Sequence, residues 1–495
     1  MISSIKPKPT LSESSNFSYI GFLAVLFVID QPLFSAGQGV NFELVIGTQK
    51  YDDAKCVIQT FDSGYVVVGS TSAFGNGQTD VYLTNISKAG KVAWQQAIGG
   101  AGVEKGNSVI QTPDSGFAIT GYSNSEGTGG YDVYLAKTDK NGILEWSNSY
   151  GGIDWDFGNS IIQTSAGDFV ICGSTYSYGN GNGDVYLLKI DPTGVLLWDS
   201  AYGGSLEDAG NSVCSTTDGG YFVAGYTKSF GQGEEDVYLL KSDSTGNLKW
   251  AKTYGGTGED RGNECKLTSD GRFIVICAAK SFSALNKYEN WLMKINSIGD
   301  TLWSRRDAAI YNRIATSVSQ TAEGGYVFTG HDDNAGQYNM FLYKTDAGGY
   351  YQDYRGYGGA QTENAFSIKQ TFDKGYVIVG TTESYGTGKP NIYVLKTDSN
   401  HLSTGTVQVV VSTHEIETKK EILSIVPNPA SDHFIVNTTE SSVIEIYDAL
   451  GRIVLTQHIA TGKNTISVTG IHEGLYFVHV REKNRVGTGK LIVRH

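Results

Sequence analysis

The 495-residue sequence is poor in histidine, proline, methionine and charged residues, which limits the functions it can support. It has 8 histidines, 8 prolines and 3 methionines, and 18% of its residues are charged, below the roughly 25% of an average globular protein. Basic residues number 38 against 51 acidic ones, so the net charge is −13. Because a surface of this sign repels phosphate groups, we expect neither nucleic acid nor anionic membrane as a partner.

The apolar run near the amino terminus is too short to span a membrane. Tyr19–Ile29 has 11 residues, whereas a membrane helix needs about 20. The run follows two lysines and precedes the small residues Ser35 and Gly37, an arrangement typical of a secretory signal. We therefore expect residues 1–37 to be a signal peptide and no membrane span in the mature protein; a buried strand or an anchor is the alternative.

The cysteines show no metal-binding pattern, because there is no Cys-x-x-Cys pair and no histidine at zinc-ligand spacing. Their number is odd, so they cannot pair completely, and all fall inside expected strands. We interpret them mostly as small buried apolar residues, with Cys265 and Cys277 as the favoured pair if a disulfide forms. The five are Cys56, Cys172, Cys214, Cys265 and Cys277.

Glycine and aromatic residues are abundant instead. There are 63 glycines, 30 tyrosines, 20 phenylalanines and 7 tryptophans, a composition that favours strands and tight turns. A single compact domain rarely reaches this length, so we expect several domains or a repeat architecture.

A unit of about 52 residues recurs seven times. Trp94, Trp146, Trp198 and Trp250 follow one another at intervals of 52, and Trp303 comes 53 residues later. A second recurring position is Asp80, Asp132, Asp184, Asp236, Glu289, Asn339 and Asn391. Each unit contains four strand-length runs bounded by turn residues, and helical periodicity is absent. Four antiparallel strands repeated seven times predict an all-β, seven-bladed β-propeller over residues 38–404.

The ring needs a strand to close it, because the seventh copy ends near Asp398 without its tryptophan strand. An extra strand, Asn41–Gly47, precedes the first copy. We predict that this amino-terminal strand completes the seventh blade and leaves no open edge. The competing candidate is Thr406–Val411.

The last part of the chain has a different pattern. After a charged linker, residues 405–420, a series of short strands from 421 to 495 predicts a small immunoglobulin-like β-sandwich. Its motifs resemble the type A sorting domain of the type IX secretion system, although Val426 stands where that family often has tyrosine. The residues that carry the resemblance are Pro427, Asn428, Pro429, Gly451, Arg452, Gly474, Tyr476 and Lys490.

The resemblance implies export across the outer membrane, with the secretion translocon and its sorting protease as partners, followed by removal of the domain. The protein would then be secreted, or attached at the outer-membrane surface. An ordinary immunoglobulin-like module that binds sugar or protein is the alternative.

One face of the propeller carries candidate binding residues. An acidic residue recurs in six copies, four residues before the serine position of the first expected strand, and Arg313 replaces it in the sixth copy. A ring of carboxylates could hold calcium or attract a cationic or hydroxyl-rich ligand. The alternative is that each carboxylate caps its own turn, and we favour a similar loop-pinning role for the Asp80-type position. The candidate residues are Asp52, Glu104, Asp156, Asp208, Asp260 and Glu363.

Histidine-based catalysis is disfavoured, because His331 is the one histidine between Asn41 and Asp398 and we expect it to face solvent. We predict a non-enzymatic binding or scaffold propeller without a cofactor, whose extracellular ligand is a glycan or a protein. The alternatives are an extracellular polysaccharide-acting enzyme and a calcium-dependent adhesin. An enzyme would use residues that break the repeat, namely Trp155, Arg261, Arg305, Arg306, Arg313 and His331.

Overall fold

The computed structural model describes residues 40–308, 310–333, 338–386, 389–411, 421–422, 425–438, 441–448, 452–482 and 485–495. The regular elements of these segments are all β-strands, which confirms the all-β fold class. Within them, no helix has the length and apolar character needed to cross a membrane. The expected signal peptide, residues 1–37, lies outside the described residues, as do residues 412–420 of the expected linker.

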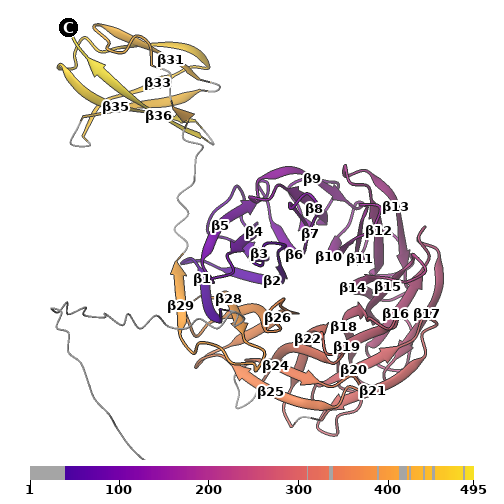
Figure 1. The fold of residues 1–495 in the computed structure, drawn as a ribbon. Helices are drawn as coiled ribbons and strands as arrows, with labels where there is room; N and C mark the ends of the chain where they lie inside the picture. Colours follow the sequence, from indigo (N-terminus) through magenta and orange to yellow (C-terminus); the bar gives the residue numbers. More distant parts are fainter. Residues whose placement is uncertain are drawn as a thin grey trace, which may run out of the picture. The chain divides into compact units, whose positions relative to one another are not determined.

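Seven antiparallel sheets form the blades of a closed ring (Figure 1). Each of the first six copies supplies four consecutive strands to one sheet. The bounds of the strands in blades 1 to 3 are β2 (Asp52–Gln59), β3 (Tyr65–Thr71), β4 (Asp80–Ile86), β5 (Val92–Ile98), β6 (Glu104–Gln111), β7 (Phe117–Ser123), β8 (Asp132–Thr138), β9 (Leu144–Tyr150), β10 (Asp156–Gln163), β11 (Phe169–Thr175), β12 (Asp184–Ile190) and β13 (Leu196–Tyr202).

Blades 4 to 6 repeat the arrangement, and blade 7 takes strands from both ends of the repeat region. Their bounds are β14 (Asp208–Ser215), β15 (Tyr221–Thr227), β16 (Asp236–Ser242), β17 (Leu248–Tyr254), β18 (Asp260–Leu267), β19 (Phe273–Ala279), β20 (Glu289–Ile295), β21 (Thr301–Asp307), β22 (Arg313–Gln320), β23 (Tyr326–Asp332), β24 (Asn339–Thr345), β25 (Tyr351–Tyr357), β26 (Glu363–Gln370), β27 (Tyr376–Thr382), β28 (Asn391–Thr397), β1 (Phe42–Gly47) and β29 (Val407–Val411).

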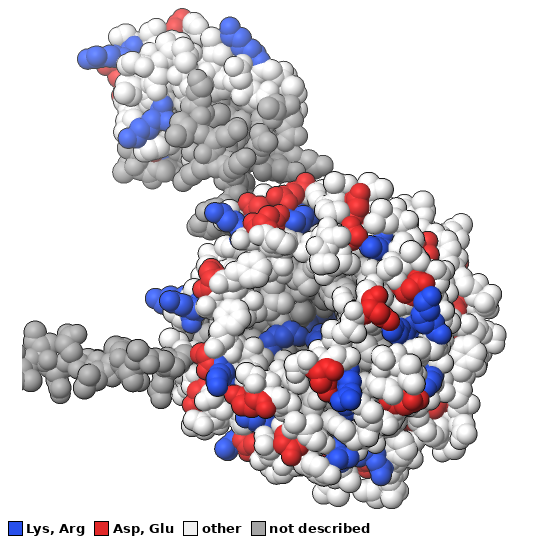
Figure 2. Space-filling view, turned by 45° about the vertical axis from the view of Figure 1, so that its right-hand side comes forward, with Lys and Arg blue, Asp and Glu red and all other residues white. Residues whose placement is uncertain are grey.

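The first strand of each blade lies nearest the centre of the ring, and the fourth lies at its rim (Figure 1). Every first strand has a β-bulge at its fourth residue, as at Asn159 between Gly158 and Ser160. A bulge increases the local twist of a strand. Figure 2 shows a hollow at the middle of the ring, with basic side-chain atoms inside it. The innermost strands carry Lys55, Lys105, Lys266 and Lys369.

Packing between neighbouring blades supplies the core of the ring. The second and third strands are buried on both faces, because each blade lies between two others; this explains apolar runs such as Phe169–Thr175. Seven hydrophobic clusters each join two consecutive blades, and one of them joins blade 7 to blade 1 through residues such as Leu44 and Val67. The core therefore runs around the whole ring.

The repeated tryptophans pack across these junctions. The Trp94 ring lies 5.9 Å from the Phe117 ring of the next blade, and Trp146 lies 6.3 Å from Phe169 in the same way. A Cβ at Gly142, in the Asp-x-x-Gly turn, would come within 2.5 Å of the Trp94 ring. The turn glycine has φ of +76° and leaves room for the indole of the preceding blade, so the motif serves blade packing.

Two strands complete blade 7. β1 pairs antiparallel with β28, with Val45 opposite Tyr393, so the prediction that the amino-terminal strand closes the ring is confirmed. β29 pairs parallel with the other edge of β1 as a fifth strand. Residues 407–411, which we had placed in the linker, therefore belong to the ring. The valine-rich sequence of this segment suits a strand that covers an edge which would otherwise offer unpaired amides.

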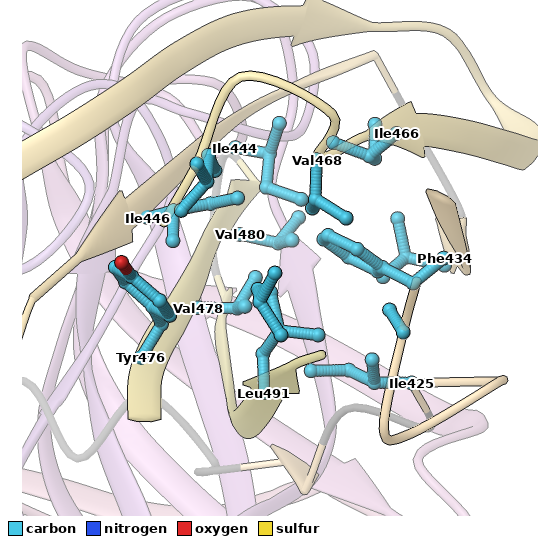
Figure 3. Close-up of a cluster of buried hydrophobic side chains, with 14 of the residues drawn as sticks. Ile425, Phe434, Ile444, Ile446, Ile466, Val468, Tyr476, Val478, Val480 and Leu491 are labelled. Carbon is cyan, nitrogen blue, oxygen red and sulfur yellow. The ribbon is translucent and has the colours of Figure 1, made fainter. Parts of the chain in front are cut away.

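The carboxy-terminal module is a small two-sheet sandwich. One sheet has the order β30-β36-β35-β32-β33, and the other pairs β31 with β34. Isoleucine, valine and leucine side chains from both sheets meet Phe434 in one core (Figure 3). The strands are β30 (Glu421–Ile422), β31 (His433–Thr438), β32 (Ser442–Tyr447), β33 (Ile453–Ile459), β34 (Gly462–Ser467), β35 (Gly474–Glu482) and β36 (Arg485–Val493).

All five cysteines are free thiols, and four of them are buried. Cys265 lies opposite Val275, and Cys277 lies opposite Gly262, so the hairpin does not bring the favoured pair together. The interpretation of the cysteines as mostly buried apolar residues is confirmed.

Candidate functional site: the loop face of the propeller

One face of the ring carries the loops that link each fourth strand to the next first strand, and each second strand to its third. We call it the loop face. In blade 3, for example, these loops are residues 151–155 and 176–183. The predicted acidic ring lies here, at the start of the innermost strands.

The six predicted carboxylates are buried and hydrogen-bonded to their own loops. Asp156 Oδ2 accepts hydrogen bonds from the Gly152 amide at 2.8 Å and from Ser177 Oγ at 2.7 Å. All six residues have an exposed fraction of 0%. Cation or ligand binding at these positions stays a prediction, whereas the capping arrangement is what the hydrogen bonds show. The amides bound by the other five belong to Thr48, Gly100, Gly204, Gly256 and Gly359.

The third-strand acids pin the glycine-rich loops, as we had favoured. Asp184 Oδ2 accepts hydrogen bonds from the amides of Asn180 at 3.0 Å and Gly181 at 3.3 Å. Its Oδ1 has no hydrogen-bond partner among the described residues and points toward Gly203, where Asp208 of the next blade also lies. Around the described part of the ring, no group of three or more histidine, cysteine or acidic side chains is placed to hold a metal ion.

Four blade junctions bring two such acids together across a glycine. At Gly151, a Cβ would lie 2.3 Å from Asp132 Oδ1 and 2.4 Å from Asp156 Oδ2. Burial, and then the charge of Asp156, raise the pKa of Asp132 to about 6. The four pairs are Asp80 with Glu104, Asp132 with Asp156, Asp184 with Asp208, and Asp236 with Asp260.

Ion pairs fill the loop face over blades 4 and 5. Arg261 makes a two-pronged contact with the buried Glu235, and its guanidinium lies 4.9 Å from the centre of the Tyr226 ring. Glu207 pairs with Lys228 at 2.6 Å. Since each charge has a partner of opposite sign, this sector leaves little unsatisfied charge for a ligand.

The other repeat-breaking arginines are also engaged. Arg313 forms an ion pair with Asp307, and Arg306 lies 4.7 Å from the centre of the Phe282 ring. Arg305, on the rim strand β21, stacks 4.2 Å from the centre of the Tyr350 ring. These contacts use the arginines to hold neighbouring elements of the ring together.

The expectation that His331 faces solvent is wrong. The residue lies on β23, between Ile314 and Met340 on the flanking strands, and its ring lies 5.2 Å from the Tyr338 ring. This burial lowers the pKa of His331 to about 4, so the imidazole is neutral at physiological pH. The prediction failed because a residue on a central strand lies between two flanking strands of its own blade, and here Tyr338 of the following loop packs against its ring.

An aromatic cluster occupies the loop face at the junction of blades 2 and 3. It consists of Tyr122, Tyr131, Trp155, Phe157 and Tyr176, whose rings meet mostly edge to face at centroid distances of 5.0–6.4 Å. Trp155 is 55% exposed. The sequence singled out Trp155 alone. In the third copy, the repeated acid Asp156 is flanked by two aromatic residues, Trp155 and Phe157. Other copies have residues such as Val103, Lys105 or Ala209 at these positions, so the aromatic pair could have indicated the cluster.

The sorting motifs of the carboxy-terminal module are tied to one another. Asn428 Nδ2 donates a hydrogen bond to the Lys490 carbonyl at 2.6 Å, and its Oδ1 accepts one from the Ile492 amide at 2.9 Å. The Pro427–Pro429 turn is thereby held against the last strand. Tyr476 Oη donates to the His472 carbonyl at 2.8 Å.

Two further motif positions lie near the turn between β32 and β33. Arg452 Nε donates a hydrogen bond to Asp448 Oδ2 at 2.8 Å. Gly451 lies outside the described residues.

Comparison with known families identifies this module. Residues 424–494 match the family described as the secretion system C-terminal sorting domain. The protein is therefore a β-propeller protein with a type IX sorting domain, exported to the cell surface or the extracellular space and handled by that secretion machinery. No curated protein matches the chain in sequence.

Several solved structures share the arrangement of strands at low sequence identity. The Neurospora crassa Pan2 WD40 domain is 12% identical over 72% of this chain and 90% of that chain, with a TM-score of 0.45. An ulvan lyase from a new family of polysaccharide lyases is 11% identical over 74% and 95%, with a TM-score of 0.47. Sqt1 from Chaetomium thermophilum is 8% identical over 81% and 96%, with a TM-score of 0.42. The fold assignment itself follows from the chain's own strand pairing.

Proposed function

We propose that the protein is a non-enzymatic binding module that holds an extracellular ligand on the loop face of its propeller. The proposal rests on a difference between two kinds of side chain on that face: the charged ones have partners, whereas an aromatic one is exposed. The recurring carboxylates are buried and hydrogen-bonded, and Arg261 and Arg313 are ion-paired. The aromatic cluster of blades 2 and 3 stays exposed through Trp155.

The same contrast argues against hydrolysis. Glycoside hydrolysis needs two carboxyl groups that both reach the substrate, one as acid and one as base or nucleophile. The recurring acids of the inner strands have no exposed surface. The imidazole of His331, with its pKa of about 4, lies within β23 beside neighbouring strands. These groups are better suited to structure than to catalysis.

Co-sedimentation of the full chain with insoluble polysaccharides and extracellular matrix proteins tests the proposal. Both the bound protein and any released soluble sugar are measured, with and without EDTA. We expect binding to at least one probe, without sugar release and without an effect of EDTA. Released sugar would contradict the proposal in favour of an enzyme, and loss of binding in EDTA would favour a calcium-dependent adhesin.

A further inference from the structure

We propose that the aromatic cluster at the junction of blades 2 and 3 binds a neutral polysaccharide, with a sugar ring stacked on Trp155. The inference rests on the proposed function and names its ligand class. Aromatic side chains offer a flat apolar surface to the C–H face of a pyranose. Polar groups beside the ring select hydroxyls.

The indole of Trp155 is held in a fixed position. A Cβ at Gly130, in the glycine-rich loop of blade 2, would come within 2.1 Å of Trp155 Cδ1, so the indole rests directly on backbone. The rings of Tyr131 and Phe157 stand at 67° and 75° to it, with centroids 6.2 Å and 6.4 Å away. A side chain fixed in this way loses little conformational entropy when a ligand binds, which favours affinity.

A cationic group lies next to the cluster. Lys105, on the innermost strand of blade 2, lies opposite Tyr122 on the paired strand β7 and is partly buried. The ammonium group of a lysine can donate hydrogen bonds to the hydroxyl groups of a sugar.

Charge selects a neutral glycan over an acidic one. The protein has a net charge of −13. An acidic polysaccharide would therefore meet net repulsion from the molecule as a whole. A neutral polysaccharide is not repelled in this way and can stack on the exposed indole of Trp155.

The test compares the full-length wild type with Trp155→Ala, Trp155→Phe and Phe372→Ala. Phe372 is the control, because it is 71% exposed and lies in the loop between β26 and β27, on the opposite face of the ring. The probes are amorphous cellulose, chitin, xylan and mannan, with alginate as the acidic comparison. We expect at least one neutral probe to retain the wild type and Phe372→Ala. Trp155→Ala should bind it at least tenfold more weakly, with Trp155→Phe in between.

Tryptophan fluorescence gives a second measurement that does not depend on an alanine variant. A soluble oligosaccharide of the retained polymer should change the emission of the wild type but not that of Trp155→Phe. Equal retention of wild type and Trp155→Ala would overturn this site while leaving the proposed function standing. Retention by matrix proteins alone, or by alginate alone, would overturn the neutral-glycan inference and leave binding intact. Retention by no probe would contradict both.

Discussion

At the residue scale, a glycine directly after the fourth strand of each of blades 1 to 4 decides how the acids of neighbouring blades meet. Gly151 lets Asp132 and Asp156 approach the same point from two blades, and both residues are buried. Two facing carboxylates cannot both ionise without cost, so one retains its proton to a higher pH. At the junction of blades 7 and 1, the Asn391 amide occupies the equivalent place beside Gly47. An amide has the shape of a protonated carboxyl group and can replace it.

Replacing Asp132 by asparagine should therefore stabilise the ring at neutral pH. The folded-state pKa of about 6 exceeds the ordinary aspartate value of 3.8, so the folded state binds more protons between these values and its stability falls as pH rises through that window. Asp132→Asn removes this loss. We expect a gain of about 1–2 kcal/mol in the free energy of unfolding at pH 7–8, shrinking toward zero near pH 4.

Thermal unfolding of wild type and Asp132→Asn, followed by circular dichroism from pH 4 to pH 8, measures this difference. The informative quantity is the change in Tm difference with pH, because a simple packing effect would be constant. A Tm difference that is the same at every pH would show that the Asp132–Asp156 pair does not retain a proton.

At the element scale, a belt of side chains joins the innermost strands. In blades 2 to 5, the bulge residue of the first strand is an asparagine. Its Nδ2 donates a hydrogen bond to a backbone carbonyl of the first strand of the next blade, as from Asn159 to Gly210 at 2.9 Å. The other asparagines in this belt are Asn107, Asn211 and Asn263. At the junction of blades 7 and 1, a cation–π contact takes the place of this hydrogen bond: Lys55 Nζ lies 4.0 Å from the centre of the Phe366 ring.

Breaking one link of this belt should weaken the ring measurably. Asn159→Ala removes the hydrogen bond to the Gly210 carbonyl in a partly buried position, and we expect the free energy of unfolding to fall by about 1–2 kcal/mol. Chemical denaturation monitored by tryptophan fluorescence measures the change. Asn364→Ala is the matched control, because Asn364 lies on the inner strand β26 but makes no such bond among the described residues. Equal stability of the two variants would contradict a structural role for the belt.

At the scale of the whole molecule, the sequence repeat made the fold predictable but did not indicate the aromatic cluster of the loop face. Each of the first five copies has an acidic residue 42 or 43 positions before its tryptophan, and the other repeated positions mark the last two copies, so blade number, strand order and ring closure follow from spacing. The burial of His331 depends on contacts within its blade, and the partners of Arg261 come from the neighbouring blade; spacing reveals neither. Tyr122 and Tyr176 are 54 positions apart in sequence, and both contact Phe157 only because neighbouring blades pack side by side.

The position of β29 predicts where the sorting domain is separated from the propeller. β29 pairs with β1 from Glu43 opposite Val407 to Gly47 opposite Val411, and Val407 and Val410 pack against the cores of the ring. A cut before Val407 would expose the edge of β1, the strand that closes the ring. We therefore expect the secreted protein to end between residues 412 and 424, as measured by intact mass spectrometry.

A pair of truncated chains tests why the boundary should lie there. A chain ending at Val411 should keep the Tm of the propeller, whereas one ending at Thr406 should lose about 1–3 kcal/mol, because two half-buried valines and the backbone pairing with β1 are removed. A mature protein that ends before Val407, or equal Tm values for the two truncations, would contradict a role for β29. The closing strand would then be stable with one paired edge, and β1 with β28 alone would hold the ring shut.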